Sequence, residues 1–184
     1  MRWPAARAQY LAVCAVASLC IAVASGCKRG GKPAAALGVF QMGERVQVGP
    51  LIYTVLDTEW RDQLGEGVEA RSPQHRFLLI RLSVTNSGIR EADIPPMSLV
   101  AAGDRFYPEV SQGAGVPEWL GYLRSVKPAA TEHGRVVFDV PTGSYRLRVA
   151  AVADEDEQPF ALIEIPYQVP ATPQVPVTPP AVSR

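Results

Sequence analysis

The chain has 184 residues with 18 basic and 18 acidic side chains, so its formal net charge is zero. A balanced charge gives no electrostatic reason to expect a nucleic-acid partner, and we expect none. This length suits one domain with one hydrophobic core.

The N-terminal segment has the features of a signal peptide over residues 1–26. Arg2 and Arg7 are its only charged residues, and the uncharged apolar run from Leu11 to Ala24 has 14 residues. Such a run is shorter than the about 20 residues that cross a bilayer. An uncleaved membrane anchor is the alternative, because the uncharged stretch from Ala8 to Gly26 is longer, at 19 residues.

The run ends in Ala24-Ser25-Gly26-Cys27, which resembles the lipobox of bacterial lipoproteins. The resemblance implies that the mature chain begins at Cys27 and that its sulfur carries a diacylglycerol with acyl chains such as palmitate. The membrane is then a partner through a lipid anchor, in the cell membrane or the outer membrane, facing the periplasm or the exterior. Ala24 departs from the leucine usual there. Cleavage after Ala24, at Ala22-Val23-Ala24, would instead give a secreted soluble domain.

Cysteine use is consistent with lipidation. Cys14 and Cys20 lie in the apolar run, so Cys27 is the only cysteine of a chain that begins there. Such a chain can form no intrachain disulfide and no cysteine-based zinc site.

Two segments flank the predicted domain. Residues 27–39 are rich in Gly and Ala and predict a flexible tether after the lipidated cysteine. Residues 169–184 belong to a Pro-rich stretch and predict a disordered tail. The domain itself is expected over residues 40–168.

Between the flanking segments the pattern is that of β-strands. In Phe77–Asn86 the apolar residues Leu78, Ile80, Leu82 and Val84 alternate with Arg81, Ser83 and Thr85. Further strands are expected over 45–60, 98–102, 106–107, 135–140, 145–149 and 160–165. Turn residues separate most of them, and no long amphipathic helix is apparent. The sequence predicts an all-β, immunoglobulin-like antiparallel sandwich of about seven strands.

Residues 43–150 also resemble a bacterial family of immunoglobulin-like extracytoplasmic domains of unknown function. Asn86 lies where that family begins a loop after its long strand, and Leu99, Gly103-Asp104 and Tyr107 echo a second segment. Pro128, Gly134 and Val137–Pro141 echo a third, in which Ala129 replaces the usual glycine. The resemblance implies the fold and no particular activity.

Few residues indicate catalysis or metal binding. His75 and His133 are the only histidines, both expected in solvated loops, and no nucleophile motif accompanies them. The acidic run Asp154, Glu155, Asp156 and Glu157 is a weak candidate for calcium, since it lacks the spacing of a calcium loop. We expect no enzyme, no cofactor and no metal.

The remaining candidates are aromatic. Trp60, Trp119 and Tyr122 flank or occupy the two longest irregular stretches, and such residues anchor partners in loops. The alternative is that Trp60 and Trp119 pack on the core. The sequence therefore predicts a non-catalytic binding or scaffold module with a possible envelope protein partner. The alternative is a structural spacer or envelope-assembly protein.

Overall fold

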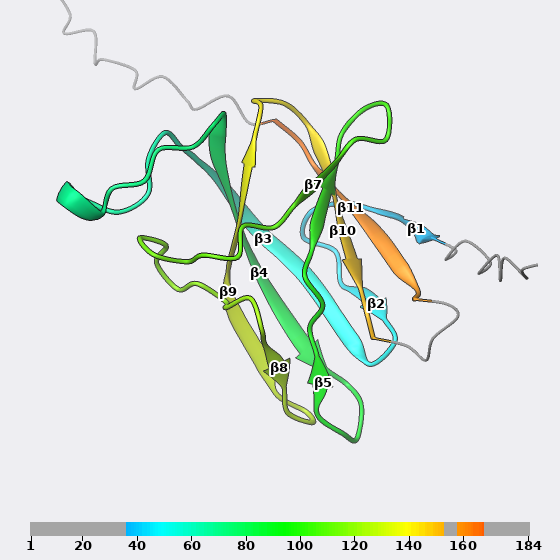
Figure 1. Cartoon of the computed structure of the whole chain (residues 1–184). Helices are drawn as coiled ribbons and strands as arrows, with labels where there is room; N and C mark the ends of the chain where they lie inside the picture. Colours follow the sequence, from blue (N-terminus) through cyan, green and yellow to red (C-terminus); the bar gives the residue numbers. More distant parts are fainter. Residues whose placement is uncertain (1–35, 153–157, 168–184) are drawn as a thin grey trace, which may run out of the picture. The chain divides into compact units, whose positions relative to one another are not determined.

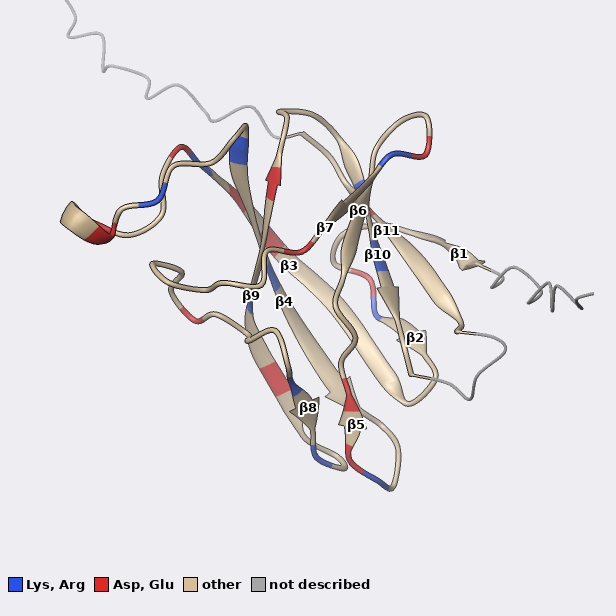
Figure 2. Ribbon diagram, in the orientation of Figure 1, with Lys and Arg blue, Asp and Glu red and all other residues tan. Residues whose placement is uncertain are grey.

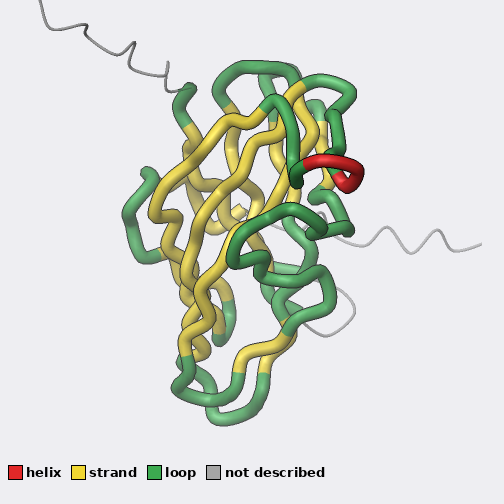
Figure 3. Tube along the Cα trace, turned by 90° about the vertical axis from the view of Figure 1, so that its left-hand side faces the viewer, coloured by secondary structure: helices red, strands yellow, loops and turns green. Residues whose placement is uncertain are grey.

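The computed structural model describes residues 36–152 and 158–167, which form a β-sandwich (Figure 1). The strands are β1 (Ala36–Phe40), β2 (Val46–Val48), β3 (Leu51–Arg61), β4 (Arg76–Asn86), β5 (Ala92–Asp93), β6 (Ser98–Val100), β7 (Phe106–Pro108), β8 (Ser125–Val126), β9 (Thr131–Val140), β10 (Tyr145–Ala150) and β11 (Phe160–Ile165). The only helix among the described residues is the short 3-10 turn η1 (Gly67–Glu69), red in Figure 3.

The strands form two main sheets. One has the order β1-β11-β10-β6-β7 and the other β2-β3-β4-β9, while β5 and β8 pair as a small ribbon. Buried side chains from both main sheets form one core. The predicted all-β sandwich is confirmed. The structure differs in detail, because the described residues hold eleven strands and β1 runs parallel to β11.

The core follows the alternation seen in the sequence. Leu78, Ile80, Leu82 and Val84 of β4 are fully buried in the main core. Val136, Phe138 and Val140 of β9 and Leu147 and Val149 of β10 lie in the same core. Because successive side chains of a strand point to opposite faces, this alternation alone directs these residues inward.

A bulge in β3 reverses its alternation. Val55 pairs with Leu82 and Asp57 pairs with Arg81, so Leu56 has no partner in the register. Before the bulge Tyr53 and Val55 face the core, whereas after it Trp60 lies opposite the core residue Leu78. An extra residue in one strand shifts the inward set by one position.

The N-terminal boundary differs from the prediction. Residues 36–39, expected in the flexible tether, belong to β1, which pairs with β11 at Ala36–Phe160 and Val39–Leu162. The register shifts between these two pairs, and Gly38 has a φ of 152°. The ordered domain therefore begins at least four residues before the predicted start at 40. The leader, Cys27, the rest of the tether, the acidic run 154–157 and the tail 169–184 lie outside the described residues.

A second, smaller core covers part of the outer face of the four-stranded sheet. Phe77 and Leu79 of β4 and Val137 of β9 point away from the main core and are buried. Leu64 and Val116, from the two long loops, complete the cluster. The loops are joined where the Arg71 guanidinium donates to the carbonyl oxygens of Gln112 (3.0 Å) and Ala114 (2.7 Å). Both faces of β4 are therefore buried in its N-terminal part, around Phe77–Ile80.

Candidate functional site

Trp119 is a packing residue of the second core. Its side chain is partly buried against that cluster, and a Cβ on Gly113 would collide with its indole ring. The neighbouring backbone closes the edge of β9, because the amide of Leu120 donates to the carbonyl of Arg135 and the amide of Arg135 donates to Glu118. This contact covers an otherwise open strand edge.

Trp60 also packs. Its ring lies against the main core and meets Tyr167 edge-on, with the ring centroids 6.0 Å apart. These contacts give Trp60 and Trp119 structural roles, and their predicted roles in binding stay predictions.

Tyr122 lies at a hollow in the surface. The hollow has a volume of about 580 Å³ and includes Leu123, which is 93% exposed. A second hollow of about 460 Å³ includes Ile89, which is 94% exposed. The two hollows share Asp93 and Val152, so they adjoin. We call this surface, with Ile89, Leu123 and Val152, the β5–β8 end.

A buried ion pair holds Tyr122 and Leu123 in place. The Arg124 guanidinium donates to both carboxylate oxygens of Glu109, at 2.6 and 2.8 Å, and the two side chains are 4% and 0% exposed. Glu109 also accepts from the amide of Met97 at 3.0 Å, and Arg124 donates to the carbonyl of Gly121. The bidentate geometry fixes the loop because it leaves a single arrangement of the two planar groups.

Asn86 holds the other side of the β5–β8 end. Its buried amide donates to the carbonyl oxygens of Arg90 (2.7 Å) and Val126 (2.8 Å), and its oxygen accepts from the amide of Gly88 (2.8 Å). Ile89 therefore projects from a loop that is fixed on both sides.

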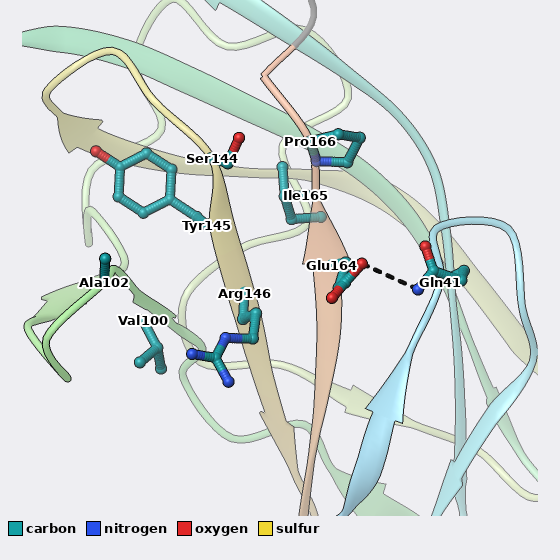
Figure 4. A pocket seen from close by; sticks show the side chains of 9 residues that line it. All are labelled: Gln41, Val100, Ala102, Ser144, Tyr145, Arg146, Glu164, Ile165 and Pro166. Atoms are coloured by element: carbon teal, nitrogen blue, oxygen red, sulfur yellow. Dashed lines mark hydrogen bonds between the residues drawn. The ribbon is translucent and has the colours of Figure 1, made fainter.

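A third hollow lies on the outer face of the five-stranded sheet (Figure 4). It has a volume of about 350 Å³, and its charged lining residues are Arg146 and Glu164. They are register partners on neighbouring strands, yet Glu164 turns away and accepts from the Gln41 side chain at 2.9 Å. Among the described residues, Arg146 has neither an ion pair nor a hydrogen bond through its side chain. The hollow therefore presents a guanidinium that none of the described residues pairs.

The two histidines are exposed and far apart in the fold. His133 lies in β9 opposite Ser83, and not in the expected loop, while His75 lies in the loop before β4. The Asp139 carboxylate near His75 accepts from backbone amides of the loop. Within 36–152 and 158–167, no group of three His, Cys, Asp or Glu residues could hold a metal ion, and no helix is long and apolar enough to cross a bilayer.

Residues 40–156 match the family described as a domain of unknown function (DUF4352), and the chain belongs to this family. This finding agrees with the resemblance to a family without an assigned activity. No curated protein matches the sequence.

Three solved structures share the fold. A candidate lipoprotein (ycdA) of Bacillus subtilis has a TM-score of 0.53 and 13% identity, with the match covering 67% of this chain and 38% of that protein. The yjhA protein of Bacillus subtilis has a TM-score of 0.50 and 14% identity, covering 67% and 99% of the two chains. A functionally unknown protein of Listeria monocytogenes has a TM-score of 0.51 and 9% identity, covering 68% and 82%. At these identities the likeness concerns the fold alone.

Proposed function

We propose that this protein is a non-catalytic, lipid-anchored binding module of the cell envelope. The lipobox-like Cys27 supplies the anchor, and the β5–β8 end binds an envelope protein. The signal-peptide pattern of residues 1–26 supports an extracytoplasmic location, and a candidate lipoprotein of Bacillus subtilis shares the fold.

The observation that carries the binding role is the exposure of aliphatic side chains at the β5–β8 end. Ile89 and Leu123 are almost fully exposed, and Val152 is 59% exposed beside both hollows. Clustered exposed apolar groups mark interaction sites on soluble domains. Both loops are held by buried hydrogen bonds, so a partner would meet a surface that is already ordered.

A photocrosslinking amino acid at position 123 tests this role in intact cells, with position 68 as the matched control. Val68 is as exposed as Leu123 but lies in η1, in the loop after β3. We expect a discrete protein adduct from position 123 and none from 68. Ile89→Asp should lower the adduct yield about thirtyfold, because a central contact contributes about 2 kcal/mol or more. Equal adducts from both positions would contradict the proposal.

The spacer role is the second candidate, and one observation favours it. The chain enters β1 beside Phe160, at the start of β11, and leaves after Ile165, at its end. Entry and exit thus lie at opposite ends of one strand, as a spacer requires. Under this alternative, deletion of 170–184 harms function while Leu123→Asp is tolerated. The binding role predicts the reverse.

A further inference from the structure

The two outer faces of the sandwich differ. The four-stranded sheet carries the second core over part of its outer face. On the five-stranded sheet, the described residues form no such cluster. Among the described residues, its outer face therefore carries no second layer of buried side chains.

The strand register gives the order of the outward side chains on this sheet. One row holds Phe106, Val100, Arg146 and Glu164, and the next holds Pro108, Ser98, Arg148, Leu162 and Val39. We call these two rows the five-stranded face. Arg146 and Arg148 lie on β10, the central strand of this sheet, where Figure 2 shows basic residues in blue, and exposed apolar residues lie at the margins of the face. Phe106 is 62% exposed and Val39 is 50% exposed.

Both central guanidiniums are available to an anion. Arg146 points away from Glu164 and toward Val100 (Figure 4). Arg148 lies over the Phe160 ring at 4.3 Å from its centroid and has no carboxylate partner among the described residues. Glu164 is the only carboxylate of the two rows, and Gln41 holds it to one side. Arginine binds phosphate through parallel N–H donors, and aromatic and aliphatic side chains suit the boundary of headgroups and acyl chains.

The place where the chain enters the domain indicates that the five-stranded face contacts the membrane. Cys27 lies nine residues before Ala36, and an extended chain of that length reaches about 30 Å at most. Ala36 begins β1, the edge strand of this same sheet. The intervening residues include Lys28, Arg29 and Lys32 and no acidic residue. A lipid on Cys27 would thus keep the five-stranded face within reach of the bilayer.

We propose that the five-stranded face lies against the anchoring membrane, with Arg146 and Arg148 on the phosphates of anionic phospholipids. This inference rests on the proposed lipid anchor. The β5–β8 end then remains at the side of the docked domain, open to a protein partner. Phe106 and Val39 enter the interfacial region on either side of the guanidiniums.

Single cysteine labels test the proposal in the lipid-anchored protein. Once Cys27 is lipidated and the leader removed, an introduced cysteine is the only free thiol. Phe106→Cys and Val39→Cys place a fluorophore on the five-stranded face, and His133→Cys places it on the exposed surface of β9 as the control. In vesicles containing phosphatidylglycerol, we expect lipid-borne quenchers to reduce the emission at 106 and 39 and not at 133. Equal quenching at all three positions would overturn the proposal.

Charge reversal tests the role of the guanidiniums. Arg146→Glu and Arg148→Glu should each lower the equilibrium constant for contact between the five-stranded face and the membrane about fivefold. Added salt should also lower this constant for the native protein. Arg90→Glu with Lys127→Glu, on exposed loops, is the matched control and should leave the quenching at 106 unchanged. Quenching that survives reversal of both arginines would overturn the proposal.

The mass of the N-terminal peptide separates the two possible failures. If Cys27 carries lipid and the labels do not distinguish the faces, the membrane-contact proposal fails and the proposed anchor stands. If Cys27 carries no lipid and the protein does not float with vesicles, the proposed function fails and this inference fails with it.

Discussion

Glu109 and Arg124 bring a charged pair into the interior beside the loop of Tyr122 and Leu123. A buried pair is costly to desolvate, and removing one partner leaves an uncompensated charge. We therefore expect Arg124→Met to lower the free energy of unfolding by about 3–5 kcal/mol, measured by urea denaturation. The double variant Glu109→Leu with Arg124→Met should recover a large part of that loss. A single variant as stable as the native protein would show that the pair is hydrated.

Tyr53 makes the stability sensitive to alkaline pH. Burial raises the pKa of its phenol well above the usual value, with Arg124 opposing the shift, and its hydroxyl donates to the carbonyl of Ala150 at 2.6 Å. The folded state therefore keeps its proton after the unfolded chain has lost it. The contribution of Tyr53 to the free energy of unfolding is complete below the pKa of the unfolded chain, about 10, and it falls by about 1.4 kcal/mol per pH unit above that value.

Urea midpoints between pH 8 and pH 11 measure this effect. Tyr53→Phe should flatten the alkaline fall relative to the native protein. Burial also raises the pKa of Tyr145, which acts with the same sign, so a residual slope is expected. Parallel pH profiles for the native protein and the variant would contradict the assignment.

Ala129 has a φ of 58°, a left-handed conformation that favours glycine. Its amide donates to the carbonyl of Asn86, so the turn is fixed. The family that residues 43–150 resemble usually has glycine at this position. Ala129→Gly should raise the free energy of unfolding by about 0.5–1 kcal/mol, because relief of the Cβ clash exceeds the added chain entropy. A lower urea midpoint for Ala129→Gly would show that the turn carries no such strain.

The second core joins the two long loops to the four-stranded sheet, and at Gly113 its packing leaves no room for a side chain. Any side chain there would displace Trp119. We expect Gly113→Val to lower the free energy of unfolding by about 2–3 kcal/mol by overpacking. Gly143→Ala, with no atom nearer than 3.9 Å to the added carbon, is the control and should be neutral. Equal thermal midpoints for both variants would contradict this packing.

Sequence patterns predicted the central strands because local alternation decides their inward faces. The continuous apolar run Phe77–Ile80 carried a further signal, since a strand buried on both faces lacks alternation. What covers its second face depends on loops that are far away in the chain. β1 was missed because a short Gly-containing segment gains its strand character from the distant β11. The direction of Trp60 depends on the bulge at Leu56, which no local pattern indicates.

The candidate surfaces were harder to predict than the fold. Tyr122 was singled out and does lie at the β5–β8 end, whereas Ile89 and Val152 are isolated aliphatic residues in separate loops. Their proximity arises only when β4 and β10 are stacked in the sandwich. The same holds for the five-stranded face. The alternation in β10 placed two arginines outward but could not show that neither has an ion-pair partner among the described residues.

Across the whole molecule, the two proposals assign separate roles to different parts of the surface. In the proposed arrangement, the lipid on Cys27 holds the chain at the membrane, the five-stranded face orients the domain on it, and the β5–β8 end binds a protein partner. Two acyl chains on one cysteine suffice for stable attachment, because each buried methylene contributes about 0.8 kcal/mol. Orientation by Arg146 and Arg148 then needs only a weak interaction.

The proposed function depends on the lipid anchor at Cys27, and the mass of the N-terminal peptide from protein extracted from its native membrane is the measurement to make first. We expect a peptide that begins at Cys27 and carries the added mass of diacylglycerol. A peptide that begins at Ser25 with a free thiol would contradict it and identify a secreted soluble domain.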